Sequence, residues 1–314
     1  MLGALSGFAI VIIVIAVGFL VGRSGVLPAG AAYAVNMFVF WVSLPAMLLD
    51  FLSQADIAAL FGVNLAVIAI STLATGLIGF LGYRFLAGRG VSDSLIAMLA
   101  VSYCNSSHLG IPLMTHLVDD PTASLPVILF QVGFYGPVSV LLLDMAAHKG
   151  GSHGVVREIT LSVVKSPLIV ASAVGIALGL IRSSTGWALP EVIAEPISIL
   201  ASTTVGAALV AFGISMAEVR ILQRPESPVR SVFAGSVVKA IVAPLLAFIV
   251  ARFLFGATGP QLLAMVLVAA LPTAQNVFTY AQRYRTGEVL ARDTGVVSTV
   301  LSVPVMTGIV WLLG

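Results

Sequence analysis

The stretch N-S-S-H-L-G-I-P at Asn105–Pro112 interrupts an apolar segment with polar residues, a glycine and a proline. Aligning Leu95–Met98 with Leu262–Met265, which lies 167 positions later, carries Asn105 onto Pro272. Both segments therefore break at the same depth. Hydrocarbon tolerates a broken helix only where the freed backbone groups line a cavity or find protein partners. Two breaks in corresponding halves of a chain predict the binding site of a transporter.

The composition places the chain in a membrane. It has 314 residues, of which 59% are hydrophobic and 9% are charged, and its mean hydropathy is +1.12. Helical spans need roughly 17–25 apolar residues, and the sequence offers ten. These lie near Leu5–Gly22, Ala32–Leu52, Val63–Leu86, Ser94–Leu117, Leu125–Ala147, Pro167–Ile181, Ile197–Met216, Val229–Leu254, Gln261–Gln282 and Thr294–Leu313. Little sequence remains for a soluble domain, so we expect an all-α integral membrane protein.

The positive charges predict the orientation. Of the 15 Lys and Arg residues, Lys239 lies inside a predicted helix, and the even-numbered connections carry only Arg182 and Arg252. The remaining twelve lie in the odd-numbered connections: Arg23, Arg84, Arg89, Lys149, Arg157, Lys165, Arg220, Arg224, Arg230, Arg283, Arg285 and Arg292. By the positive-inside rule, these connections are cytoplasmic and both termini face outward.

The same residues exclude several classes of protein. A net charge of +2 gives no reason to expect nucleic-acid binding. The lone Cys104 rules out an intramolecular disulfide and a cysteine metal cluster. The chain also lacks an H-E-x-x-H pattern and a phosphate-binding glycine loop. We therefore expect no enzyme, no metal and no cofactor. The first apolar segment lacks a basic start and a cleavage site, so we expect a retained helix.

Internal matches suggest a repeat. A-V-G-F-L-V-G at Ala16–Gly22 is similar to A-V-G-I-A-L-G at Ala173–Gly179, and Arg84–Leu86 matches Arg252–Leu254. Two copies of a five-helix unit would sit upside down relative to each other, because five is odd. The predicted units are residues 1–147 and 167–314, joined by a cytoplasmic linker at 148–166. Chance alignment of apolar sequence is the alternative.

The residues in the two breaks are the first candidates for a binding site. A broken helix presents carbonyls at the end of its first half and amide hydrogens at the start of its second half. Crossed breaks could hold an anion with those amides. Gly110, Pro112 and Pro272 would shape the breaks. The neutral donors and acceptors there would either contact the substrate or only satisfy the freed backbone: Asn105, Ser106, Ser107, Gln275 and Asn276.

Three further residues are candidates by position. Lys239 lies near the middle of the eighth span, where a charge costs ~2.5–3.5 kcal/mol on insertion scales. It is either a counter-charge for an anionic substrate or a partner for carbonyl ends at the crossing. His108 could titrate near neutral pH, and Gln131 is a weaker pocket candidate. All 13 acidic residues lie in connections or near helix ends, so no carboxylate is placed to carry a proton at the crossing.

The motifs N-S-S-H-L-G-I-P-L at Asn105–Leu113 and L-P-T-A-Q-N-V-F-T-Y-A-Q-R-Y at Leu271–Tyr284 resemble the auxin efflux carrier family, in its bacterial malonate/malate-transporter-like branch. The resemblance covers essentially the whole chain. It implies ten helices in two inverted repeats, with helices 4 and 9 crossing at the substrate site. The implied fold is that of bile acid symporters and sodium–proton antiporters. Asn105 matches the family's substrate-facing asparagine, whereas Ser106 and Val277 replace prolines of plant auxin carriers.

The resemblance also implies a scaffold of helices 1, 2, 6 and 7, a mobile unit of helices 3–5 and 8–10, elevator-type transport and a homodimer. The reading is therefore a gradient-driven carrier of a small organic anion in the bacterial inner membrane. One alternative is a sodium- or proton-coupled symporter or antiporter. Another is a membrane sensor that binds a ligand without moving it.

Overall fold

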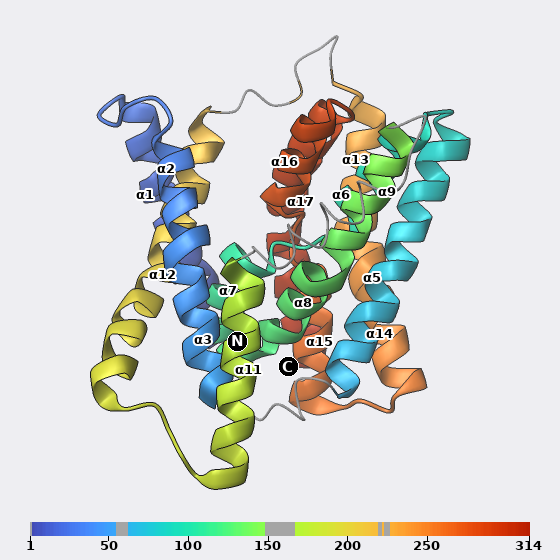
Figure 1. Ribbon diagram of the computed structural model, residues 1–314. Helices are drawn as coiled ribbons and strands as arrows, with labels where there is room; N and C mark the ends of the chain where they lie inside the picture. The colour runs from blue at the N-terminus through green and yellow to red at the C-terminus, as the bar shows by residue number, and fades with distance from the viewer. Residues whose placement is uncertain (1, 55–61, 148–166, 219–221, 223–226) are drawn as a thin grey trace.

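The computed structural model describes residues 2–54, 62–147, 167–218, 222 and 227–314, and these are mostly helical (Figure 1). The elements before residue 148 are α1 (Leu2–Ser24), α2 (Ala31–Phe38), η1 (Val39–Ser43), α3 (Leu44–Gln54), α5 (Val63–Leu81), η2 (Gly82–Leu86), α6 (Val91–Ser102), η3 (Ser106–Gly110), α7 (Ile111–Leu117), η4 (Pro121–Ser124), α8 (Leu125–Phe130), η5 (Gln131–Tyr135) and α9 (Gly136–Ala147). Those after residue 166 are α11 (Pro167–Thr185), α12 (Glu191–Glu218), α13 (Val229–Val237), η6 (Val238–Val242), α14 (Ala243–Ile249), η7 (Val250–Leu254), α15 (Gly259–Ala270), α16 (Gln275–Tyr284) and α17 (Glu288–Leu313).

Every predicted span coincides with helix. Among the described residues, six helices are long and apolar enough to cross a membrane, and four shorter apolar helices accompany them. Two of the shorter helices, α6 and α15, stop at the predicted breaks: α6 ends at Ser102 and α15 at Ala270. The chain is multi-pass and all-α over the part described. The inverted five-helix repeat stays a prediction, and the predicted linker at 148–166 lies outside the described residues.

Prolines explain where several helices widen. Four π-helical turns, η1, η3, η5 and η6, each end two residues before a proline, namely Pro45, Pro112, Pro137 and Pro244. A proline inside a helix lacks an N–H and collides with the carbonyl four residues earlier. A wider turn before the proline relieves that collision, and such turns often mark functional sites. Gln131 and Lys239 lie in two of these wide turns, η5 and η6.

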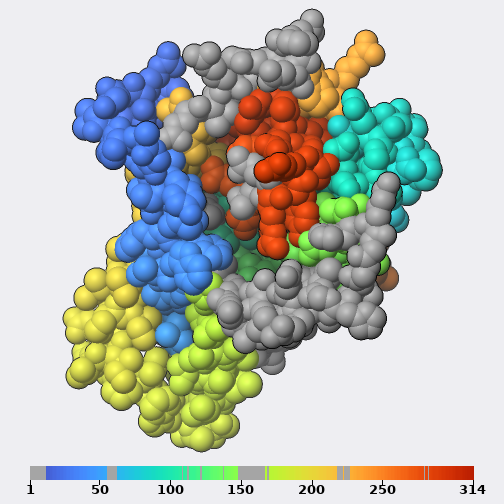
Figure 2. Space-filling view, turned by 45° about the horizontal axis from the view of Figure 1, so that its top comes forward, coloured from blue at the N-terminus to red at the C-terminus, as the bar shows by residue number. Residues whose placement is uncertain are grey.

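The helices form two groups (Figure 1). In the first, α1 packs on α12, and α3 packs on both α11 and α12. We call α1, α2, α3, α11 and α12 the scaffold group, and the remaining helices the crossing group. Glycines allow the closest approach inside the scaffold group: a Cβ on Gly213 of α12 would lie 2.1 Å from the carbonyl oxygen of Ile15 in α1. Figure 2 shows α16 and α17, in orange-red, between the blue N-terminal helices and the cyan segment.

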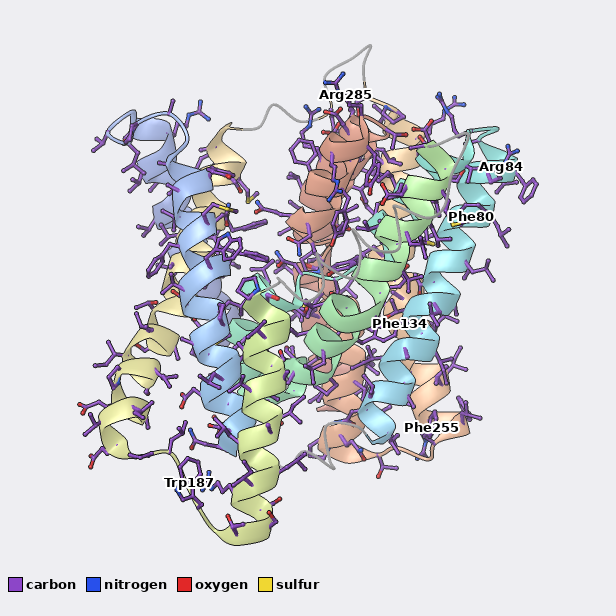
Figure 3. All side chains as sticks on the ribbon, viewed as in Figure 1. Phe80, Arg84, Phe134, Trp187, Phe255 and Arg285 are labelled. Atoms are coloured by element: carbon purple, nitrogen blue, oxygen red, sulfur yellow. The ribbon has the colours of Figure 1, made fainter. Side chains whose placement is uncertain are left out.

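Residues from connections predicted to be cytoplasmic and residues from connections predicted to face outward lie at opposite ends of the molecule. Arg84 and Arg285, from connections predicted to be cytoplasmic, lie at one end (Figure 3). Trp187 and Phe255, from connections predicted to face outward, lie at the other end.

Candidate functional site

The two helix breaks lie directly against each other. The backbone N–H of Asn105 donates to the carbonyl of Pro272 at 2.7 Å, and the N–H of Ala274 donates to the carbonyl of Tyr103 at 3.0 Å. These bonds flank Cys104 and Thr273, which face each other as an isolated antiparallel bridge. Two segments 169 residues apart thus satisfy each other's backbone in the middle of the helical bundle.

In such a bridge, the polar groups of the central residues point away from the partner strand, so they need other partners. In the amide orientation that satisfies both of its ends, Gln131 donates to the carbonyl of Cys104 at 2.9 Å and accepts from its N–H at 2.9 Å. The N–H of Thr273 donates to the hydroxyl of Ser298 at 3.1 Å. Gln131 and Ser298 are 167 positions apart, which is the offset that aligns the two breaks in the sequence.

The carbonyl ends of the two first halves are also satisfied by side chains. The Thr273 hydroxyl donates to the carbonyl of Ala100, in the last turn of α6, at 2.6 Å. The Lys239 ammonium donates to the carbonyl of Ala269, in the last turn of α15, at 2.9 Å. Each partner places a hydrogen-bond donor at the negative end of a half-helix dipole. In this structure Lys239 is a partner for a carbonyl end, and its predicted role as a counter-charge for the substrate stays a prediction.

Asn105 organises the start of the second half of its helix. Its carbonyl accepts from the N–H groups of Leu109 and Gly110 at 3.1 and 3.0 Å. The side chains of Asn105 and Ser106 are buried, and Ser107 is half-buried. A Cβ on Gly110 would lie 2.8 Å from the Leu271 side chain and 2.9 Å from the Ser124 side chain, so a larger residue would have to displace both side chains.

Two predicted residues cannot be assessed by their side chains. The backbone of His108 forms part of η3, and Pro112 lies in the first turn of α7. The side chains of both residues lie outside the described part of the structure. Their roles in proton coupling and in shaping the break stay predictions.

A cavity of about 270 Å³ opens between the scaffold group and the crossing group. The wall from the crossing group includes Gln275 at the second break and Arg292 of α17. The wall from the scaffold group includes Asn36 of α2 and Ser215 of α12. The remaining wall residues are Tyr33, Phe212, Met216, Thr273, Ala274, Phe278, Ala291, Gly295 and Val296. The cavity thus has an apolar and aromatic lining with a few polar groups, as ligand sites usually do.

The polar groups of this cavity differ in how they are held. The Gln275 amide donates to the Ser215 hydroxyl at 2.7 Å and so bridges the two helix groups. The side-chain oxygen of Asn36 is buried and finds no hydrogen-bond partner among the described residues. Polar atoms left in that state are costly. The cavity wall therefore includes a residue whose buried side-chain oxygen has no partner among the described residues.

Arg292 brings a positive charge to the cavity. Its Nε donates to the Asp293 carboxylate at 2.8 Å, and its two terminal nitrogens carry further donors. Asp293 is fully buried and also accepts from the Ser227 hydroxyl at 2.7 Å and from the Leu222 N–H at 3.2 Å. These bonds hold the Arg292 side chain against one face of a fixed carboxylate.

Sequence reasoning missed Arg292, Asn36 and Ser215 as site residues. In the sequence, Arg292 was counted only as a positive charge of a connection predicted to be cytoplasmic. In the structure, it lies within α17. The Arg–Asp pair at the start of an apolar helix was the signal available for Arg292. Asn36 and Ser215 carry no local signal, because only folding brings α2 and α12 to the second break.

The other predicted site residues lie elsewhere around the crossing. Asn276 contacts the Tyr103 hydroxyl, beside Tyr280. Lys239 lines a second, much smaller polar cavity together with Ser71 and other hydroxyl residues. The predicted candidates thus lie on different sides of one crossing. Among those whose side chains the structure describes, Gln275 is the one polar or charged candidate that lines the larger cavity.

Comparison with known proteins supports a transport role. The profile of a family described as "Membrane transport protein" matches residues 5–310. A protein of Rhizobium meliloti (strain 1021), named "Putative malonate transporter", is 27% identical over 303 residues, which cover 94% of this chain and 91% of the relative. Both matches extend over nearly the whole chain.

Proposed function

The chain belongs to the membrane transport protein family, and on that premise we propose that it carries a small organic anion, of the malonate or malate kind, across the bacterial inner membrane. The observation that supports this proposal is the cavity of about 270 Å³ between the two helix groups, which combines Arg292 with the amides of Gln275 and Asn36. Drug-sized ligands fill cavities of roughly 300–1,000 Å³. A smaller cavity suits a short carboxylate.

The chemistry of the cavity wall favours an anion. An arginine side chain binds carboxylates through its planar fork of donors. Arg292 uses Nε for Asp293, which leaves its terminal nitrogens for a ligand. Helix α16 begins at Gln275 in the cavity wall, and the start of a helix carries positive partial charge. In our proposal, one carboxylate of the substrate lies between Arg292 and the start of α16.

The arrangement of the helix groups supports alternating access. In our proposal, the crossing group moves against the scaffold group in the manner of an elevator, within a homodimer, and the two halves are inverted repeats. The Gln275–Ser215 hydrogen bond lies between the two groups and would break during this movement. Asn105 and Ser106 are buried in the present conformation. Their proposed contact with the substrate would form in a different conformation.

The first experiment is uptake into liposomes containing the purified protein. We expect saturable uptake of labelled malonate or malate that an excess of the unlabelled compound blocks, and weaker uptake of indole-3-acetate. Empty liposomes are the control. No uptake of any short carboxylate under either a sodium or a proton gradient would contradict the proposal.

Binding measured in parallel separates a carrier from a sensor. A carboxylate that raises the melting temperature but is never taken up would favour a ligand sensor. Uptake that requires sodium or a pH gradient would favour a coupled symporter or antiporter. A carboxylate that stabilises the wild type but not Asn105→Ala would support the proposed substrate contact of Asn105.

A further inference from the structure

A second polar cavity lies at the crossing and is built from elements other than those around the larger cavity. It has a volume of about 10 Å³, and its polar lining consists of the hydroxyls of Ser71, Thr72, Thr75 and Ser102, the Cys104 thiol and Lys239. We propose that the Lys239 ammonium occupies a monovalent-cation site here, as a covalently tethered substitute for a sodium ion. This inference goes beyond the proposed function, because it concerns the cation and not the transported anion.

The hydroxyl groups around the cavity are arranged as acceptors. Ser71 donates its proton to the carbonyl of Val67 at 2.7 Å, and Thr75 donates to the carbonyl of Ser71 at 2.7 Å. Ser102 likewise donates to the carbonyl of Met98 at 2.6 Å, and it accepts from the Tyr135 hydroxyl at 2.7 Å, which leaves it one further lone pair. A hydroxyl has one proton and two lone pairs. Since these protons are used within their own helices, oxygen lone pairs remain for a cation, which is the ligand type that hard cations prefer.

The end of a half-helix completes this site. α15 ends at Ala270, next to the break, so the carbonyls of its last turn carry negative partial charge. The Lys239 ammonium donates to one of them, that of Ala269, at 2.9 Å. In carriers with broken helices, carbonyl ends of this kind coordinate sodium ions or protons. Lys239 thus places its charge where such a carrier would hold its ion.

The charge of Lys239 is balanced by dipoles. Its side chain is 2% exposed, and the residues lining the cavity include no carboxylate. Within the described residues, the one ion pair joins Arg292 to Asp293 and does not involve Lys239. The ammonium donates to one helix-end carbonyl and borders a cavity lined by hydroxyl groups, which are the ligand types of a bound alkali ion.

The size of the cavity accounts for the exclusion of a free ion. A cavity needs ~10–15 Å³ to hold one water molecule, and this one measures about 10 Å³ beside the lysine side chain. That volume is at the lower limit for a single water molecule, so a sodium ion with a water shell does not fit beside the Lys239 side chain. Shortening the lysine would empty the site, while keeping the oxygen ligands of Ser71, Ser102 and Ala269.

Thermal unfolding in different salts tests this proposal without any substrate. The purified wild type, Lys239→Ala and Lys239→Met are unfolded at constant ionic strength in chloride salts of sodium, lithium, potassium or N-methylglucamine. We expect the wild type to melt at one temperature in all four. Lys239→Ala should melt lower in N-methylglucamine and recover by several degrees as sodium is titrated, with saturation.

The methionine variant is the matched control. Methionine fills the space of the lysine stem but carries no charge, so Lys239→Met should melt lower than the wild type and ignore sodium. Adding Ser71→Ala to Lys239→Ala should weaken the apparent sodium affinity by about tenfold or more. Equal melting of Lys239→Ala in all four salts would overturn the proposal.

The test remains decisive if a variant cannot be purified or if the proposed transport function is wrong. If Lys239→Ala cannot be purified, Lys239→Ser replaces it, because serine also empties the site and adds one oxygen. Sodium-dependent stabilisation of the wild type would overturn the proposal by itself. None of these measurements depends on anion transport, so a failure of the proposed function would leave their outcome unchanged.

Discussion

The side-chain amide of Gln131 pairs with both backbone polar groups of Cys104, at 2.9 Å each. The Gln131 side chain, from η5, thereby makes the two hydrogen bonds that a neighbouring strand would make with Cys104 in a sheet. Ser298 of α17 performs the corresponding task for the N–H of Thr273. In this structure the pairing gives Gln131 a role in supporting the break, and its predicted role as a weaker pocket candidate stays a prediction. At each break, a side chain from the next predicted span therefore forms hydrogen bonds with backbone groups that the partner segment does not satisfy.

This relationship predicts an unequal loss of stability. Gln131→Leu leaves two buried backbone groups without partners, at ~1–3 kcal/mol each, so we expect the free energy of unfolding to fall by roughly 2–6 kcal/mol. Ser298→Ala removes one partner and should cost about 1 kcal/mol. Unfolding in detergent by denaturant measures both. Gln261→Leu is the control, because Gln261 is exposed and bonds to Asn64 near the surface. Equal stability of Gln131→Leu and Gln261→Leu would contradict the assignment.

The Gln275–Ser215 bond predicts that a cross-link between the helix groups stops transport. In a Cys104→Ser background, Gln275→Cys with Ser215→Cys should lose uptake on treatment with a short bifunctional thiol reagent. A cleavable reagent should allow recovery on reduction. The physical reason is that the bond joins α16 of the crossing group to α12 of the scaffold group.

A matched pair inside the crossing group is the control. Gln261 of α15 and Asn64 of α5 are also hydrogen-bonded, at 3.2 Å. Cross-linking cysteines at these two positions should leave uptake intact, because both helices would move together. Full activity of the cross-linked 275/215 pair would exclude movement between the two groups.

Arg292 should control affinity for the anion. Arg292→Gln removes the charge and most of the fork of donors, so we expect KM for a dicarboxylate to rise about tenfold or more, since charge-assisted bonds contribute roughly 1.5–3 kcal/mol. Arg292→Lys keeps the charge and should lose less. Arg285→Gln, at the exposed end that the sequence predicts to be cytoplasmic, is the control. Unchanged KM in Arg292→Gln would place the anion elsewhere.

Close helix packing in the scaffold group predicts a position-specific effect of alanine. In Gly213→Ala the new Cβ would lie 2.1 Å from the carbonyl oxygen of Ile15 and 2.7 Å from the nitrogen of Phe19. Since α1 and α12 must then separate, we expect a loss of roughly 1–3 kcal/mol. Gly206→Ala in the same helix meets no atom within 4 Å. That control should change stability by less than ~0.5 kcal/mol, and an equal loss in both would refute the packing argument.

Several elements could be read from the sequence because their signals are local. The spans Val63–Leu86 and Val229–Leu254 agree with the structure to the residue, counting the π-helical turns at their ends. Apolar length and flanking charges are properties of one continuous segment. The prolines Pro45, Pro137 and Pro244 are likewise local causes of the wide turns that precede them.

The candidate site was only partly readable. Gln275 lies in the cavity as its place in the break suggested, whereas Lys239 and Gln131 support the crossing. A polar residue in a membrane helix signals that it has a partner. It does not say whether that partner is a substrate or a backbone carbonyl.

By itself, the sequence determined the membrane class, the ten apolar segments, the two breaks and the alternation of charge between the ends. Each follows from hydropathy or chain chemistry within a single stretch. Only the tertiary structure decided which carbonyl Lys239 meets and that Arg292, Gln275 and Asn36 share one cavity. The physical reason is that these contacts join helices far apart in the chain. Their geometry depends on how the helices pack, which no local pattern encodes.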